Sequence, residues 1–67
     1  MYMPTTQEKE YLLSEREKGV SYLYRADGSM LIGSAIGGGQ FVIVMVSESG
    51  KRLGTYVYDL KELYLIN

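Results

Sequence analysis

The side chains of this chain that could take part in chemistry are carboxylates, tyrosines, lysines and arginines, because the sequence contains neither histidine nor cysteine. Histidine is the commonest general base and cysteine the strongest side-chain nucleophile, so the usual routes to catalysis are missing. Only carboxylates and carbonyls remain as metal ligands, and no pair of groups has the spacing of a catalytic site. We therefore expect no enzyme activity, no catalytic residue, no metal and no cofactor.

Two further patterns suggest ligand chemistry but do not support it. The glutamates near the N-terminus scatter around the predicted helix and read as a solvated face: Glu8, Glu10, Glu15 and Glu17. The triplet Gly37-Gly38-Gly39 is typical of a phosphate cradle, but no helix follows it and no lysine stands at P-loop spacing. We interpret the triplet as a flexible connection between strands.

The 67-residue chain allows one domain, residues 1–67, with a net charge of −1. A domain of this size buries only about 60% of the surface that its unfolded chain exposes, so its stability is marginal. Disulfides, metals or oligomerisation usually reinforce such domains. With no cysteine, we expect either an oligomer or a very well-packed core. A net charge of −1 gives no overall electrostatic attraction to nucleic acid, and we expect no DNA partner.

No run of 18 apolar residues is present, so the sequence predicts no transmembrane helix and no membrane partner. The first ten residues are polar and partly acidic, unlike a signal peptide. We therefore expect a cytoplasmic location.

The N-terminal segment predicts a helix over about residues 5–18. Thr5 and Glu8 have capping-box spacing, and Gly19 stands where a helix is expected to stop. Its apolar stripe is short, around Tyr11 to Leu13, so we expect the helix to lie on a surface with one narrow face buried.

The remainder, about residues 20–66, has the composition of short strands. Asp27-Gly28 is a strong hairpin signal, and Gly33 and Gly54 predict bends or bulges within strands. We expect five strands, over residues 20–26, 29–36, 40–46, 52–58 and 63–66. The sequence thus predicts a mostly β fold with an N-terminal helix: a small, strongly bent, five-stranded antiparallel barrel of the Sm-like or SH3-like kind.

The strand from Gln40 to Val46 is apolar on both faces and must be covered on both sides. It forms either the core of the barrel or a core on one face and an oligomer interface on the other. The last two predicted strands carry no proline, and Arg52 is their one charged residue, so their edges invite pairing with another copy. Closing a ring would remove these edges.

Several motifs in this order resemble the bacterial Sm-like RNA chaperone Hfq. The similar segments are Thr6-Gln7-Glu8, Tyr11-Leu12, the series Tyr24, Asp27-Gly28, Leu31 and Gly33, the run Gln40-Phe41-Val42-Ile43-Val44, and Tyr56-Val57-Tyr58. The chain departs from the family at RNA-contacting positions: Gly39 replaces an aspartate, Asp59-Leu60 replaces a Lys-His pair, Met30 replaces a lysine, and Glu15 to Lys18 replaces an arginine-rich patch.

The resemblance implies a ring of identical subunits, usually a hexamer, that binds single-stranded RNA in post-transcriptional regulation. It implies a U-rich site on the pore face, with Phe41 as the stacking aromatic and Gln7 and Gln40 as its polar companions. It implies an A-rich site on the opposite face, formed by Tyr24, Arg25, Gly28 and Leu31. Six copies of Asp59 near the pore would repel phosphate.

Each of these residues also has an ordinary structural interpretation. Phe41 fits a core position, Gln40 a surface amide, and Tyr24 the cladding of a barrel; Lys51-Arg52 fits a solvated hairpin tip. The alternative function follows from these interpretations and from the lost Lys-His pair. It is an Sm-like or SH3-like barrel that has lost RNA binding and acts as a protein-interaction module.

Overall fold

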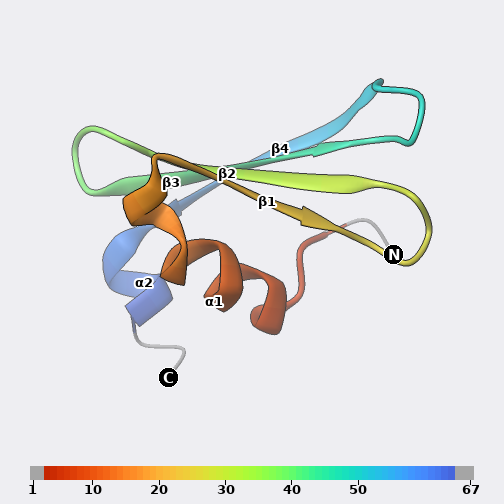
Figure 1. The fold of residues 1–67 in the computed structure, drawn as a ribbon. Coiled ribbons are helices and arrows are strands. Elements are labelled where there is room, and N and C mark those ends of the chain that lie inside the picture. Colours follow the sequence, from red (N-terminus) through yellow and green to blue (C-terminus); the bar gives the residue numbers. More distant parts are fainter. Residues whose placement is uncertain (1–2, 65–67) are drawn as a thin grey trace.

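The computed structural model describes residues 3–64, and they form two layers, a sheet and a pair of helices on one side of it (Figure 1). The sheet is antiparallel, with four strands in the order β1-β2-β3-β4. The elements in chain order are α1 (Thr6–Ser14), the 3-10 turn η1 (Arg16–Lys18), β1 (Val20–Tyr24), β2 (Met30–Ile36), β3 (Gln40–Val46), β4 (Arg52–Asp59) and α2 (Leu60–Tyr64). The predicted mostly β fold with an N-terminal helix is therefore confirmed.

Helix α1 begins with the predicted capping box. The Glu8 amide donates to the Thr5 hydroxyl at 3.1 Å, and the Thr5 amide donates to the Glu8 carboxylate at 2.8 Å. The helix ends at Ser14, four residues before the predicted end, because the chain tightens into the 3-10 turn η1. Gly19, at a φ of 96°, then turns the chain into β1, a conformation that favours glycine.

The first four strands lie close to their predicted ranges, and Asp27-Gly28 does stand in a hairpin turn. The Arg25 amide closes that hairpin by donating to the Ser29 carbonyl at 2.8 Å. Gly28 takes a φ of 89° within the turn, where a residue with a side chain would be strained.

Gly33 does not form the predicted bulge, because the pairing of β2 with β1 and with β3 runs through it without a shift. It is required for another reason. A Cβ at Gly33 would lie 2.8 Å from the ring of Phe41, which lies across the glycine. Gly54 does adjoin an irregularity, since the register of β3 with β4 shifts opposite Met45 and Val46.

The core lies between the sheet and α1. We call the helix-covered side of the sheet its inner face. The inner-face side chains of β2 and β3 alternate with outward ones, and Leu31, Phe41, Ile43 and Met45 have no exposed surface. Leu12 of α1 completes the core, and its carbonyl accepts a hydrogen bond from the buried Ser21 hydroxyl at 3.0 Å. The predicted narrow apolar stripe of the helix is confirmed at Leu12 and Leu13, which are buried, whereas Tyr11 is exposed.

The fifth strand is wrong at its first two positions, because Leu63 and Tyr64 belong to α2; residues 65–66 lie outside the described residues. Residues 60–62 are leucine, lysine and glutamate, which are good helix formers. The Leu60 amide donates to the Gly39 carbonyl at 2.9 Å, which holds the start of α2 against the β2–β3 turn. Without a strand joining β1 to β4, the sheet of residues 3–64 is open and does not close into the predicted barrel.

Neither of the helices described within residues 3–64 is long and apolar enough to cross a membrane.

Candidate interaction surface

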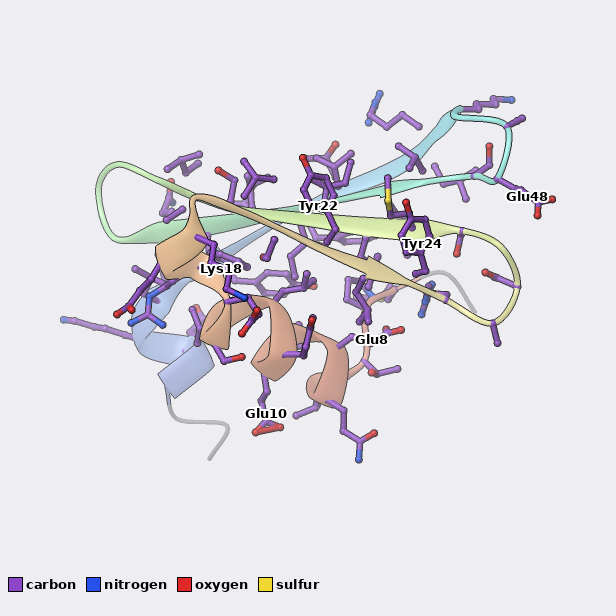
Figure 2. All side chains as sticks on the ribbon, in the orientation of Figure 1. Glu8, Glu10, Lys18, Tyr22, Tyr24 and Glu48 are labelled. Carbon is purple, nitrogen blue, oxygen red and sulfur yellow. The ribbon has the colours of Figure 1, made fainter. Side chains whose placement is uncertain are left out.

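The side of the sheet away from the helices, which we call the outer face, is uncovered among the described residues. Both α1 and α2 lie on the inner side, and nothing within residues 3–64 covers the outer face (Figure 1). Tyr22 and Tyr24 project from β1 on this uncovered side (Figure 2).

Strand pairing aligns the outer-face side chains in rows across the sheet. The rows are Tyr24–Met30–Val46–Arg52, Tyr22–Ile32–Val44–Thr55, Val20–Ser34–Val42–Val57 and Ile36–Gln40–Asp59. Ten of these 15 side chains are aliphatic, methionine or tyrosine. Two thirds of the side chains on this surface are therefore apolar or aromatic, although water reaches it.

Exposure varies across the outer face in a regular way. Tyr24 at the edge is 77% exposed, Tyr22 is 55% exposed and Val57 on the other edge strand is 54% exposed. The central residues Val42 and Val44 are half-buried by their neighbours. Monomeric soluble proteins rarely leave such a contiguous apolar patch in water, and such patches mark interaction sites.

The outer face carries few charged side chains, and these lie at its corners. Arg52 and Asp59 are its charged residues, at opposite ends of β4. The Arg52 guanidinium donates to the Thr55 hydroxyl at 3.1 Å, which places both side chains on the same side of the strand. A polar rim around an apolar centre is typical of a protein–protein interface.

The residues predicted for the A-rich RNA site do not share one face. Tyr24 is on the outer face, whereas Leu31 is completely buried in the core. Gly28 lies in the β1–β2 turn, and Arg25 reaches the helix side, where its Nη1 contacts the Met45 sulfur at 3.5 Å. Of this set, the outer face holds only Tyr24 as an exposed aromatic ring.

The residues predicted for the pore face are also separated. Phe41 is fully buried, so in this chain its ring fills the core and is not an accessible stacking platform. Gln7 is exposed in the first turn of α1, at the end of the sheet where Glu8 pairs with Arg25. Gln40 is half-buried on the outer face at the opposite end, paired with Ile36 and Asp59. The ordinary interpretation of Phe41, as a core residue, is the one that the structure shows.

A bidentate ion pair joins α1 to the end of β1. The Arg25 guanidinium donates to the two carboxylate oxygens of Glu8 at 2.9 and 3.0 Å, and its Nη2 also donates to the Met3 carbonyl at 3.2 Å. Burial raises the pKa of the Glu8 carboxyl, but the Thr5 amide and the Arg25 guanidinium outweigh it and leave the pKa below its ordinary value. The pair therefore holds the N-terminal end of α1 against the sheet.

An open depression lies along the β1 edge beside this ion pair. Its volume is about 510 Å³, and its lining residues are Glu8, Leu23, Tyr24, Arg25, Ala26 and Asp27. Two carboxylates face one guanidinium there, and that guanidinium is already engaged. The balance of charge is unfavourable for a phosphate group.

The inner side of β4 holds the two tyrosines that resembled the fourth strand of Hfq. Lys9 of α1 places its ammonium 4.8 Å from the centre of the Tyr58 ring. Burial, with a smaller effect of Tyr56, raises the pKa of the Tyr58 hydroxyl, which has no hydrogen-bond partner among the described residues. Asp59, the next residue, points to the outer face and is exposed.

Comparison of the chain with protein-family models, with curated proteins and with solved structures finds no match. The resemblance to Hfq therefore stays a prediction that rests on short motifs. Among residues 3–64, no three carboxylates come together in a way that would hold a metal ion.

Sequence reasoning left open that one face of the strand Gln40 to Val46 is an oligomer interface, but it did not identify the outer face of the whole sheet as a site. The strand Gln40 to Val46 is apolar at both odd and even positions, and only its odd-numbered residues are covered by the helices. The sequence shows that two covers are needed, but only the fold shows which one the chain supplies.

Proposed function

We propose that this protein is a protein-interaction module that binds its partner through the outer face of the sheet. The observation that supports the proposal is the apolar surface itself, with Tyr22 and Val57 each more than half exposed and two charges at its corners. Covering such a surface releases water from apolar groups, which is the main driving force of protein association.

The balance of charge favours a protein partner over a polyanion. The net charge is −1, and Arg52 is the one cation among the described outer-face residues. Nucleic-acid affinity depends mainly on lysine and arginine contacts to phosphates. A face with one arginine and one aspartate has little to offer a phosphate backbone.

The test compares affinity capture by the native chain with capture by Val44→Glu, which places a carboxylate at the centre of the outer face. We expect a partner retained by the native chain to be lost with Val44→Glu and kept with Glu17→Lys, a larger charge change placed in η1 on the helix side. Equal retention by Val44→Glu would overturn the proposal. Circular dichroism checks each fold, and Val57→Glu, at an already exposed position, is the second variant.

A second candidate function is the binding of single-stranded RNA by an Hfq-like ring, in which neighbouring subunits complete a small barrel. It is favoured by Tyr22 and Tyr24, two exposed rings on one strand and one face. Stacking a base on an exposed aromatic ring contributes about 1–3 kcal/mol, and β-sheet RNA-binding modules use such rings.

Fluorescence anisotropy with labelled A-rich and U-rich RNA tests this second candidate. We expect binding to A-rich RNA that falls at least tenfold in Tyr24→Ala, with Tyr11→Ala as a control, since Tyr11 is also exposed but lies on α1. No binding of either RNA at low salt would exclude the RNA function and leave the interaction module.

A further inference from the structure

We infer that the partner is a second copy of this chain, packed face to face with the first so that the two outer faces form the centre of a β-sandwich. This inference rests on the proposed function and adds the identity and orientation of the partner. It follows from three properties of the outer face: its width, its apolar centre and the position of its two charges.

The width of the face matches another sheet. Four strands about 4.8 Å apart span roughly 19 Å, whereas one α-helix is about 10 Å across and would cover about half of that width. Two sheets stacked about 10 Å apart cover each other fully, and the natural twist sets them about 30° from parallel. The sheet of this chain is open on its outer side and has this twist (Figure 1).

The area is close to the lower limit for a specific dimer. Four strands of about seven residues present a projected area of roughly 450 Å² on each copy, before the relief of the side chains is counted. Two copies together therefore bury roughly 900 Å² or more, close to the roughly 1,000 Å² expected of a biological interface. The chain is small and has no disulfide, so this cover also supplies the reinforcement that such a domain needs.

The two charges give the face a self-complementary pattern. A two-fold axis in the interface and perpendicular to the strands lays β4 of one copy antiparallel over β4 of the other. Arg52, at the start of β4, then lies over Asp59, at the end of β4 in the second copy, and the reverse contact forms by symmetry. Opposite charges meet at two corners of the interface, and no like charges are opposed.

The same axis places apolar residues at the centre. It passes between the row of Val44 and the row of Val42, so each of these valines faces the other across the interface. On β1, the ring of Tyr22 faces Val20 of the second copy in the same arrangement. Large apolar groups thus fill the middle and charges stand at the rim, as in known interfaces.

Sedimentation velocity of the full chain from about 1 µM to about 1 mM tests the dimer. We expect a dimer of twice the 7.6 kDa chain mass that Val44→Glu, or Val57→Glu where folding requires it, dissociates. A monomer throughout this range overturns the inference but leaves the interaction module, whose capture test is separate. A dimer that persists in both variants uses another surface and also overturns it.

Charge reversal tests the orientation. Arg52→Glu and Asp59→Arg should each weaken dimerisation at least tenfold at low salt, because each opposes like charges at two corners. An equimolar mixture of these two variants should dimerise as the native chain does, since both corners then pair opposite charges. The Glu17→Lys variant should dimerise normally. Failure of the mixture to recover, with both variants folded, overturns this arrangement.

Discussion

The two faces of this sheet are built from nearly the same residue types but differ in cover. Along β3 the inner residues Phe41, Ile43 and Met45 have no exposed surface, and the outer residues between them are half-buried. The inner face is covered by the chain's own α1, whereas the outer face has no cover within residues 3–64. The difference shows that apolar residues on both sides of a strand predict that both faces are covered. The pattern does not show whether the same chain supplies each cover.

The two glycines that pair within the sheet both lie on the inner face. On the inner face, Gly33 lies under the ring of Phe41 and Gly54 lies under the ring of Tyr56. Close packing against these two rings leaves no room for a side chain at either point. The rows of the outer face contain no glycine.

The largest expected effect comes from two neighbouring positions on β3. Phe41→Ala should lower the free energy of unfolding by about 3–5 kcal/mol, because it empties a fully buried site. Val42→Ala, on the outer side, should lower it by about 1 kcal/mol or less at concentrations where the chain is monomeric. Urea unfolding of both variants checks the contrast. Similar losses at the two positions would show that the outer face is covered after all.

The second-largest loss of stability is expected at Gly33, where the ring of Phe41 leaves no space for a side chain. Gly33→Ala should lower the free energy of unfolding by about 1–3 kcal/mol, because its Cβ would lie 2.8 Å from the buried Phe41 ring. Gly37→Ala is the matched control, since its Cβ meets nothing within 4 Å and it should be neutral or slightly stabilising. Thermal unfolding distinguishes the two, and a neutral Gly33→Ala would contradict this account of the glycine.

A smaller effect comes from the contacts that hold α1 on the inner face. Glu8→Ala loses both the capping box and the Arg25 pair and should lower stability by about 1–2 kcal/mol. Glu8→Gln keeps a side chain that can complete the capping box and loses only the charge, so it should lower stability by less. Chemical unfolding of the two variants at neutral pH measures the difference.

The same pair predicts the direction of a pH dependence. The pKa of Glu8 is lower in the folded chain than its ordinary value, so its stabilising effect is present above the ordinary pKa and is lost as the pH falls through the folded pKa. The native chain should therefore lose its stability advantage over Glu8→Gln as the pH falls below the ordinary pKa of a glutamate carboxyl and through the lower pKa of Glu8 in the folded chain. Parallel losses in both chains would show that Glu8 is not the group responsible.

The smallest effect is expected at the most exposed ring. Tyr24→Thr keeps a good strand former at a position that is 77% exposed, so the stability of the monomer should change by no more than about 0.5 kcal/mol. Thermal unfolding at low micromolar concentration measures it. A larger loss would indicate that Tyr24 supports the fold.

Local sequence signals determined where α1 begins and where the four strands of this protein lie. The spacing of Thr5 and Glu8 predicted the start of the helix, and Asp27-Gly28 predicted the first hairpin; both are confirmed. These features depend on contacts between residues close in the chain, which a sequence displays directly. The four strands were predicted for the same reason, because alternation and β-branched residues act locally.

Only the tertiary structure decided how these elements combine. Residues 60–64 form α2, which includes the first two positions of the strand expected over residues 63–66, and the sheet of the described residues stays open. The predicted site residues are spread over the core, α1, a turn and the outer face. A resemblance between short motifs does not determine which face of the sheet a side chain occupies. A strand that is apolar on both sides offers two equivalent faces. The packing of α1 through Leu12 covers the inner face, and the outer face has no cover among residues 3–64.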